Sequence, residues 1–209
     1  MPGPTPFVLA GGHRALDFVN TEIASDGARR DLLTGFSDLV HWLEQMRAID
    51  RGTASSALAR WNGKREGAAV LAEARRLRAA LRRAVEAAAA GRPVPRSSLT
   101  AINGMLQRGA LTGRVLPAQS GGFTLRRGLR LREPTDLLVP VAEAAGDLLC
   151  AHDLGRVRRC AHPACILYFL DATKNGTRRW CDMRTCGNRM NAAAYYRRRR
   201  RARPSIAEV

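Results

Sequence analysis

Four cysteines near the carboxyl end of the chain form two pairs of equal spacing. Cys160 pairs with Cys165 and Cys181 with Cys186, so the pattern is CxxxxC, fifteen residues, CxxxxC. Disulfides are rare in cytosolic proteins, so in such a protein two cysteine pairs of this kind indicate a structural zinc site. A module of about 50 residues also gains from the metal the stability that its small core lacks. The pattern predicts one structural zinc ion held by four thiolates.

Other states of these cysteines remain open at this point. Each cysteine could be buried as a small apolar side chain, or the four could form two disulfides. A catalytic zinc would need an open coordination position, which four thiolates close. His162, inside the first pair, could replace a cysteine as ligand; otherwise it lies at the knuckle or on the surface. Cys150 falls beside the apolar stripe of a helix and is expected in the core.

Positive charge surrounds these cysteines. The chain has 209 residues, a net charge of +17 and a pI near 11.4, and all but two of its 35 basic residues are arginine. Residues 156–203 hold 14 basic residues and two acidic ones. A GC-rich genome would raise the arginine content evenly along the chain, so this concentration favours a polyanionic partner.

The residues after Cys186 are expected to form a basic helix that begins at the metal site, where a helix N-terminus stabilises a thiolate. Five consecutive arginines must surround such a helix, so they are solvated or bound to phosphate. Arg189 is the best single contact, with a packing role inside the finger as the alternative. The predicted nucleic-acid contacts are Lys174, Arg178, Arg179, Arg184, Asn188, Arg189, Arg197, Arg198, Arg199, Arg200 and Arg201.

The remaining sequence predicts the elements that position this module. Apolar spacing indicates helices over 37–49, 64–90, 96–108 and 134–151, and a β-hairpin around residues 120–122. The segment "ASDGARRD" is expected to be a polar loop, and "RRWC" a returning strand. The arginines of 64–90 are expected on a solvated face, with phosphate binding as the alternative. We therefore expect an α+β fold, with a mostly helical domain over 1–152 containing a small antiparallel sheet, and a zinc module over 156–203.

Several classes of protein are disfavoured. The sequence has no apolar run long enough for a membrane span and no signal-peptide pattern, so a cytoplasmic protein is expected. We find no nucleophile–base set or phosphate loop and expect no enzyme. The polar residues of "GGHRALDFVNTE" could line a ligand pocket, or could instead cap helices and satisfy internal hydrogen bonds. These residues are His13, Asp17, Asn20 and Thr21.

The stretch "RRCAHPACILYFLDATKNGTRRWCDMRTCGNRMNAAAYYRRRR" resembles the CGNR zinc-finger family, and "GGHRALDFVNTE" resembles the ABATE domain that accompanies this finger in bacteria. The resemblance implies a bacterial, stress-induced transcription regulator with a treble-clef-like finger. It assigns the zinc ligands to Cys160, Cys165, Cys181 and Cys186. Family members often have lysine and alanine soon after the motif, where this chain has "MNAAA". This difference leaves the zinc ligands unchanged and is expected to alter one phosphate contact.

The function expected from these features is DNA-binding transcription regulation through the zinc-supported helix. The N-terminal domain would then dimerise the protein or sense a small effector. An RNA- or ribosome-binding protein is the first alternative, because phosphate contacts do not distinguish DNA from RNA. An enzyme built on the N-terminal domain is the second.

Overall fold

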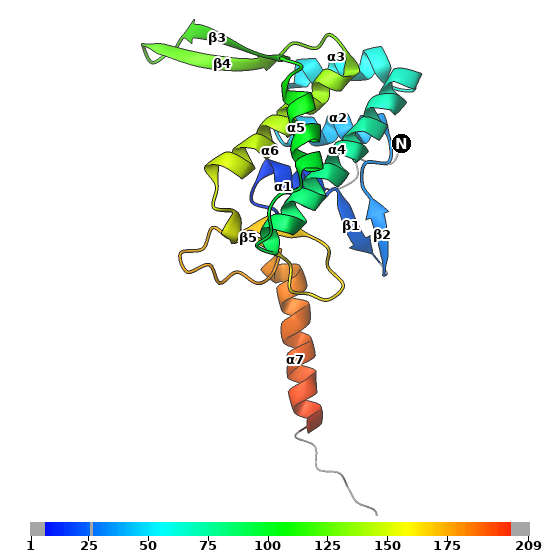
Figure 1. Cartoon of the computed structure of the whole chain (residues 1–209), viewed down its shortest axis with the longest axis vertical. Coiled ribbons are helices and arrows are strands. Elements are labelled where there is room, and N and C mark those ends of the chain that lie inside the picture. Colours follow the sequence, from blue (N-terminus) through cyan, green and yellow to red (C-terminus); the bar gives the residue numbers. More distant parts are fainter. Residues whose placement is uncertain (1–6, 26, 202–209) are drawn as a thin grey trace, which may run out of the picture.

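The computed structural model describes residues 7–25 and 27–201. Helices α1 to α6 form a body, from which the β3–β4 hairpin and helix α7 extend at opposite ends (Figure 1). The elements are α1 (Arg14–Val19), β1 (Glu22–Ser25), β2 (Ala28–Asp31), α2 (Phe36–Gln45), α3 (Arg51–Trp61), α4 (Arg65–Ala89), α5 (Arg96–Leu106), β3 (Leu111–Pro117), β4 (Phe123–Leu129), η1 (Pro134–Leu138), α6 (Val139–Ala151), η2 (Leu154–Arg156), β5 (Val157–Arg159), β6 (Tyr168–Leu170), η3 (Met183–Gly187) and α7 (Asn188–Arg201).

The strands form three separate antiparallel pairs within the described residues, β1–β2, β3–β4 and β5–β6. The fold is therefore mostly helical α+β, as the sequence predicted. No helix in the described ranges combines the length and the apolar character that crossing a bilayer requires.

The predicted long helix forms α4 and carries the centre of the core. Val70, Ala74, Leu77 and Leu81 follow the three- and four-residue spacing of one helix face, and all four are buried. Each fully buried valine or leucine contributes about 1.5–3 kcal/mol to folding. This face packs against α1, α2 and α5, so α4 is the support on which the other elements are placed.

The segment expected to be a polar loop forms the β1–β2 hairpin. Ile23 is opposite Arg30, and Gly27 adopts a left-handed backbone conformation (φ 79°) in the turn. Residues of β2 are mostly exposed, so no apolar alternation marks the strand in the sequence. Contacts with α4 supply what the pattern lacks, because the Asp31 carboxylate at the end of β2 pairs with Arg75 at 3.0 Å and with Arg78.

Two arginines of α4 are buried, although the sequence placed all of them on a solvated face. Arg78 donates to both carboxylate oxygens of Asp31 at 2.6 and 2.7 Å. Burial of Asp31 opposes its ionisation, but the hydrogen bonds from Arg78 and from the Leu33 amide outweigh burial and lower its pKa. Arg83, in contrast, is exposed as expected.

Arg82 connects the body to the carboxyl-terminal finger. Its guanidinium donates to the carbonyl oxygens of Val19 (2.9 Å) and Ile166 (3.3 Å) and lies 3.1 Å from the Glu22 carboxylate. Burial of the guanidinium disfavours its charged form and lowers its pKa, while the Glu22 charge opposes this shift. A buried cation at this point therefore holds backbone from both parts of the chain.

The finger shares the core of the body. Val157 of β5 and Tyr168 of β6 belong to the same buried cluster as the α4 residues. The fully buried side chain of Asn20 donates to the Tyr168 carbonyl at 2.8 Å and accepts from the Tyr168 amide at 3.0 Å. The Leu170 amide donates to the Gly11 carbonyl at 2.8 Å. The β5–β6 hairpin is thus fixed to the body by packing and by backbone hydrogen bonds.

Replacing Arg82 by methionine should lower the free energy of unfolding by about 3 kcal/mol, because it leaves Glu22 and two carbonyls without their buried partner. The measurement is urea unfolding followed by circular dichroism. Arg83→Met, on the exposed side of the same helix, should change stability by less than about 0.5 kcal/mol. Equal effects of the two substitutions would contradict the role given to Arg82.

Candidate metal centre and basic helix

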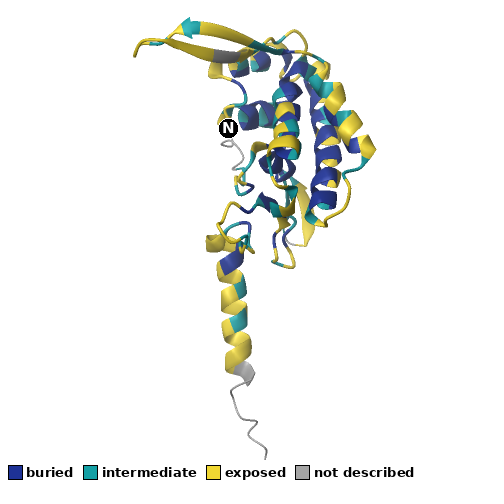
Figure 2. Ribbon diagram, turned by 60° about the vertical axis from the view of Figure 1, so that its left-hand side comes forward, coloured by how far each residue is buried: buried dark blue, intermediate teal, exposed yellow. Residues whose placement is uncertain are grey.

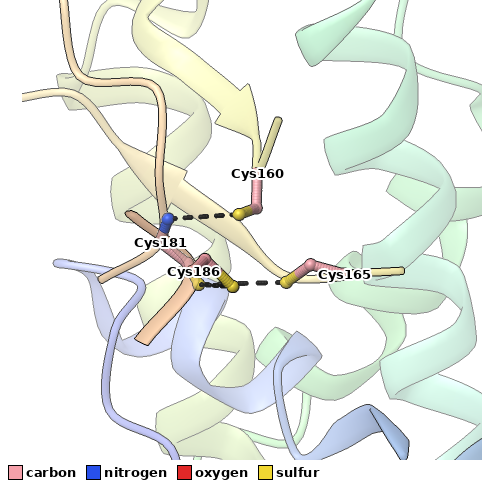
Figure 3. Close-up of side chains that lie close together, drawn as sticks. All are labelled: Cys160, Cys165, Cys181 and Cys186. Atoms are coloured by element: carbon pink, nitrogen blue, oxygen red, sulfur yellow. Dashed lines mark hydrogen bonds between the residues drawn. The ribbon is translucent and has the colours of Figure 1, made fainter. Parts of the chain in front are cut away.

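The four cysteines of the sequence pattern meet in one buried cluster (Figure 3). Cys160 follows β5, and Cys165 lies three residues before β6 begins, at the end of a tight knuckle. Cys181 lies in the loop before η3. Cys186 lies in η3, the first turn leading into α7. Their sulfur atoms all lie within 4.8 Å of one another. A knuckle, a β-hairpin and a helix around one cluster form the treble-clef-like arrangement that was predicted.

The geometry of the cluster fits zinc. Four Zn–S bonds of about 2.3 Å in tetrahedral directions separate neighbouring sulfur atoms by about 3.8 Å. The Cys165 and Cys181 sulfurs are 3.8 Å apart, and those of Cys181 and Cys186 are 3.6 Å apart. When bound, the ion would link the knuckle, the loop and the helix, and four thiolates would leave no position for substrate.

The electrostatics of the cluster also favour a cation. Hydrogen bonds from Cys165 and Cys181 hold the pKa of Cys160 well below its usual value, so its sulfur carries the first negative charge. The contact with Cys160 raises the pKa of Cys165 to about 12 and also raises the pKa of Cys181. The thiols alone therefore resist ionising together. A divalent metal neutralises the sulfurs and allows all four to bind as thiolates.

Backbone donors and a glycine complete the site. The Cys181 amide donates to the Cys160 sulfur at 3.4 Å. A Cβ at Gly187 would overlap the sulfur of Met183 and lie 3.2 Å from the Trp180 ring, so a larger residue requires these two side chains to shift. The Asp182 carboxylate accepts from the Thr185 amide at 2.9 Å and begins the turn that carries Cys186. The glycine of the CGNR signature is thus explained by close packing.

Two predictions near the cluster need correction. "RRWC" is a loop within the described residues and not a returning strand. Cys150 is exposed on α6 and not part of the core, because its position faces away from the buried stripe of that helix. His162 is half-buried in the knuckle, where its Nδ1 accepts from the Ala164 amide at 3.2 Å, and it does not belong to the sulfur cluster.

Helix α7 begins at the metal site and extends away from the rest of the protein (Figures 1 and 2). It contacts mainly η3, the turn at its own root. Its sides are largely exposed, and Tyr195 and Tyr196 are 52% and 63% exposed. The predicted contacts with exposed side chains are Lys174, Arg179, Arg184, Asn188, Arg189, Arg197, Arg198 and Arg199. Arg200 and Arg201 continue the helix, and their side chains lie outside the described residues.

Arg178 differs from the other predicted contacts. Its guanidinium donates to the carbonyl oxygens of Ala10 (3.0 Å), Trp180 (3.0 Å) and Cys181, and it lies 4.3 Å above the Phe169 ring. The Asp171 carboxylate accepts from the Arg178 amide at 2.9 Å. This arginine is therefore directed into the finger and ties the loop of the third cysteine to the N-terminal segment.

The structure separates the four predicted pocket residues. His13 and Asp17 line a groove of about 960 Å³ between α1, α3 and α6, together with Glu44, Arg47 and Glu143. Burial raises the pKa of Asp17, while the Gly11 amide, which donates to Oδ1 at 2.8 Å, opposes this shift.

The other two predicted pocket residues have structural roles. The Asn20 side chain hydrogen-bonds to the Tyr168 backbone. The Thr21 hydroxyl donates to the Phe18 carbonyl at 2.7 Å and accepts from Arg78 at 2.9 Å.

His13 also belongs to a second cluster of polar side chains at this groove. Its Nε2 lies 2.9 Å from the Asp147 carboxylate, and the Nε2 of His152 lies 3.4 Å from the same oxygen. The Nδ1 of His13 accepts from the Ala15 amide at 3.2 Å and caps α1. With Nδ1 as an acceptor, the neutral ring carries its proton on Nε2, which donates to Asp147.

The carboxyl-terminal part is a zinc finger, because a β-hairpin, a knuckle and a helix surround four buried cysteines. The family model of the CGNR zinc finger matches residues 156–199. The ABATE model, described as "putative stress-induced transcription regulator", matches residues 12–152, and the chain belongs to this family. No curated protein matches the chain significantly.

Cys181→Ser should reduce the bound zinc from one ion per chain to none, because three thiolates and a hydroxyl bind the ion far more weakly. Zinc is measured by elemental analysis of the purified protein. Cys150→Ser is the matched control and should keep one ion, since Cys150 lies outside the cluster. Zinc retained in the Cys181 variant, or lost in the Cys150 variant, would refute the assigned ligands.

Proposed function

We propose that this ABATE-family protein is a DNA-binding transcription regulator that acts in the bacterial cytoplasm, with α7 as a DNA-contacting helix. The observation that carries the proposal is that α7 is a projecting basic helix anchored at one end by the zinc cluster. A helix that packs on its own protein buries an apolar face, and α7 lacks such a face over its described side chains.

The dimensions and charge of α7 suit duplex DNA. Its 14 residues extend for about 21 Å. With side chains, a helix is about 10–12 Å wide and fits the major groove, which is about 12 Å wide. Arg189, Arg197, Arg198 and Arg199 are exposed and form no ion pair with any described residue. Phosphate contacts by these residues would supply most of the affinity and little of the sequence preference.

RNA binding is the second candidate, because an exposed arginine helix also recognises RNA backbone shape. The two are separated by competition between a DNA duplex and a structured RNA of equal charge at one salt concentration. Preferential displacement of the protein by RNA would replace the DNA proposal.

We further propose that the N-terminal body controls the finger rather than catalysing a reaction. The groove beside His13 is a candidate effector site, and dimerisation through the body is the other proposed role.

Neutralising Arg197, Arg198 and Arg199 together by glutamine should flatten the salt dependence of DNA binding. Each lost phosphate contact lowers the slope of log K against log salt by about 0.9, so the triple variant should lose between about 2 and 3. The slope is measured by fluorescence anisotropy of a labelled duplex between low and moderate salt.

The matched control removes the same charge from the body, by replacing Lys64, Arg65 and Arg76 with glutamine. These three side chains are exposed and lie far from the finger in the sequence. The control should keep the original slope. If both variants flatten the slope equally, binding reflects net charge alone and α7 has no special role.

A further inference from the structure

A second basic element leaves the opposite end of the molecule from α7, in a part of the chain with an unusual charge balance. Residues 87–132 contain eight arginines and no acidic residue. This segment includes the β3–β4 hairpin, which extends away from the helices (Figures 1 and 2). The arginines are Arg92, Arg96, Arg108, Arg114, Arg126, Arg127, Arg130 and Arg132.

The hairpin is long for a pair of strands with no other sheet partner. Its register extends from Leu111 opposite Leu129 to Pro117 opposite Phe123, seven residues in each strand. Such strands extend for about 23 Å. An isolated two-stranded hairpin is only marginally stable in water. Two seven-residue strands without a third strand therefore suggest that the hairpin contacts a partner when it functions.

One face of the hairpin is apolar and uncovered. Val115, Phe123 and Leu125 are 66%, 80% and 56% exposed. Val115 is directly opposite Leu125, and Phe123 lies two positions along the strand from Leu125, so all three share a face. These three are among the most exposed large apolar residues in the described chain. They form a continuous surface near the tip, where a partner would make contact.

The charge of the hairpin identifies the kind of partner. In the register of the two strands, Arg114 is opposite Arg126, so the hairpin carries arginine on both strands. Arg114, Arg130 and Arg132 are exposed and have no ion pair with a described residue. A second copy of the chain would bring identical arginines together, whereas a polyanion would neutralise them.

We propose that the β3–β4 hairpin is a second DNA-binding element that enters the major groove of a duplex. This inference rests on the proposed function of α7. The major groove admits a two-stranded ribbon as well as a helix, arginines along the ribbon meet the phosphates, and an apolar face can contact thymine methyl groups. Because the hairpin and α7 leave opposite ends of the molecule, they contact separate stretches of DNA.

The first test neutralises the hairpin by replacing Arg114, Arg126 and Arg127 with glutamine. The slope of log K against log salt should fall by between about 2 and 3, and affinity at moderate salt by about tenfold or more. The body variant with Lys64, Arg65 and Arg76 replaced by glutamine is again the control. An unchanged thermal midpoint of the hairpin variant shows that the fold is intact.

A second test keeps the charge and uses a photo-crosslinker at the apolar tip. With benzoylphenylalanine in place of Phe123, irradiation should link the protein to a bound duplex. The same crosslinker in place of Leu99, which is exposed on α5, should give no product. This test remains decisive if the charge variant folds poorly, because the substitution at Phe123 changes an exposed side chain only.

The outcomes distinguish this inference from the proposed function. If the α7 variant loses affinity while the hairpin variant and the Phe123 crosslinker show no contact, the hairpin inference falls and the role of α7 stands. If neither variant alters DNA binding, both fall. If the hairpin variant lowers the sedimentation mass of the free protein, the face joins two copies of the chain and the proposed DNA contact is wrong. Crosslinking to RNA in preference to a duplex also overturns it.

Discussion

The four cysteine sulfurs must converge in one buried site although their negative charges repel one another. Several features of the carboxyl-terminal part serve this requirement. The knuckle brings Cys160 and Cys165 together, the Asp182 turn delivers Cys186, and Gly187 leaves room for the Met183 and Trp180 side chains. A metal ion resolves the repulsion, and the same ion fixes the root of α7. A helix with little apolar surface can then project from the protein because its first turn is anchored.

The zinc cluster is in turn held by the N-terminal body. Asn20, Arg82 and Arg178 each hydrogen-bond to backbone of the other part of the chain, and Tyr168 is packed in the main core. The residues that first suggested a ligand pocket are therefore divided between two roles. Asn20 and Thr21 join elements, while His13 and Asp17 border the open groove.

The sequence was sufficient for features governed by local chemistry. Cysteine spacing located the metal site, the apolar spacing of Val70 to Leu81 located α4, and glycines located the β3–β4 turn. It failed where distant residues decide the outcome. Nothing local distinguishes the buried Arg78 and Arg82 from the exposed Arg83, because the difference lies in Asp31, Glu22 and Ile166, which come from elsewhere in the chain. Strand β2 was missed for the same reason, since its partners and not its own apolar pattern hold it in place.

Because α7 is held at its first turn, a small rotation there produces a large displacement at its far end. The helix is a rod of about 21 Å, so a rotation of about 10° at its root moves its far end by about 4 Å. Successive charges on a duplex are about 1.7 Å apart along its axis. In the proposed DNA complex, a displacement of this size would carry the end of α7 past more than one phosphate. The packing of Tyr168 against Asn20, at the root of the finger, would then bear on where the helix meets the duplex.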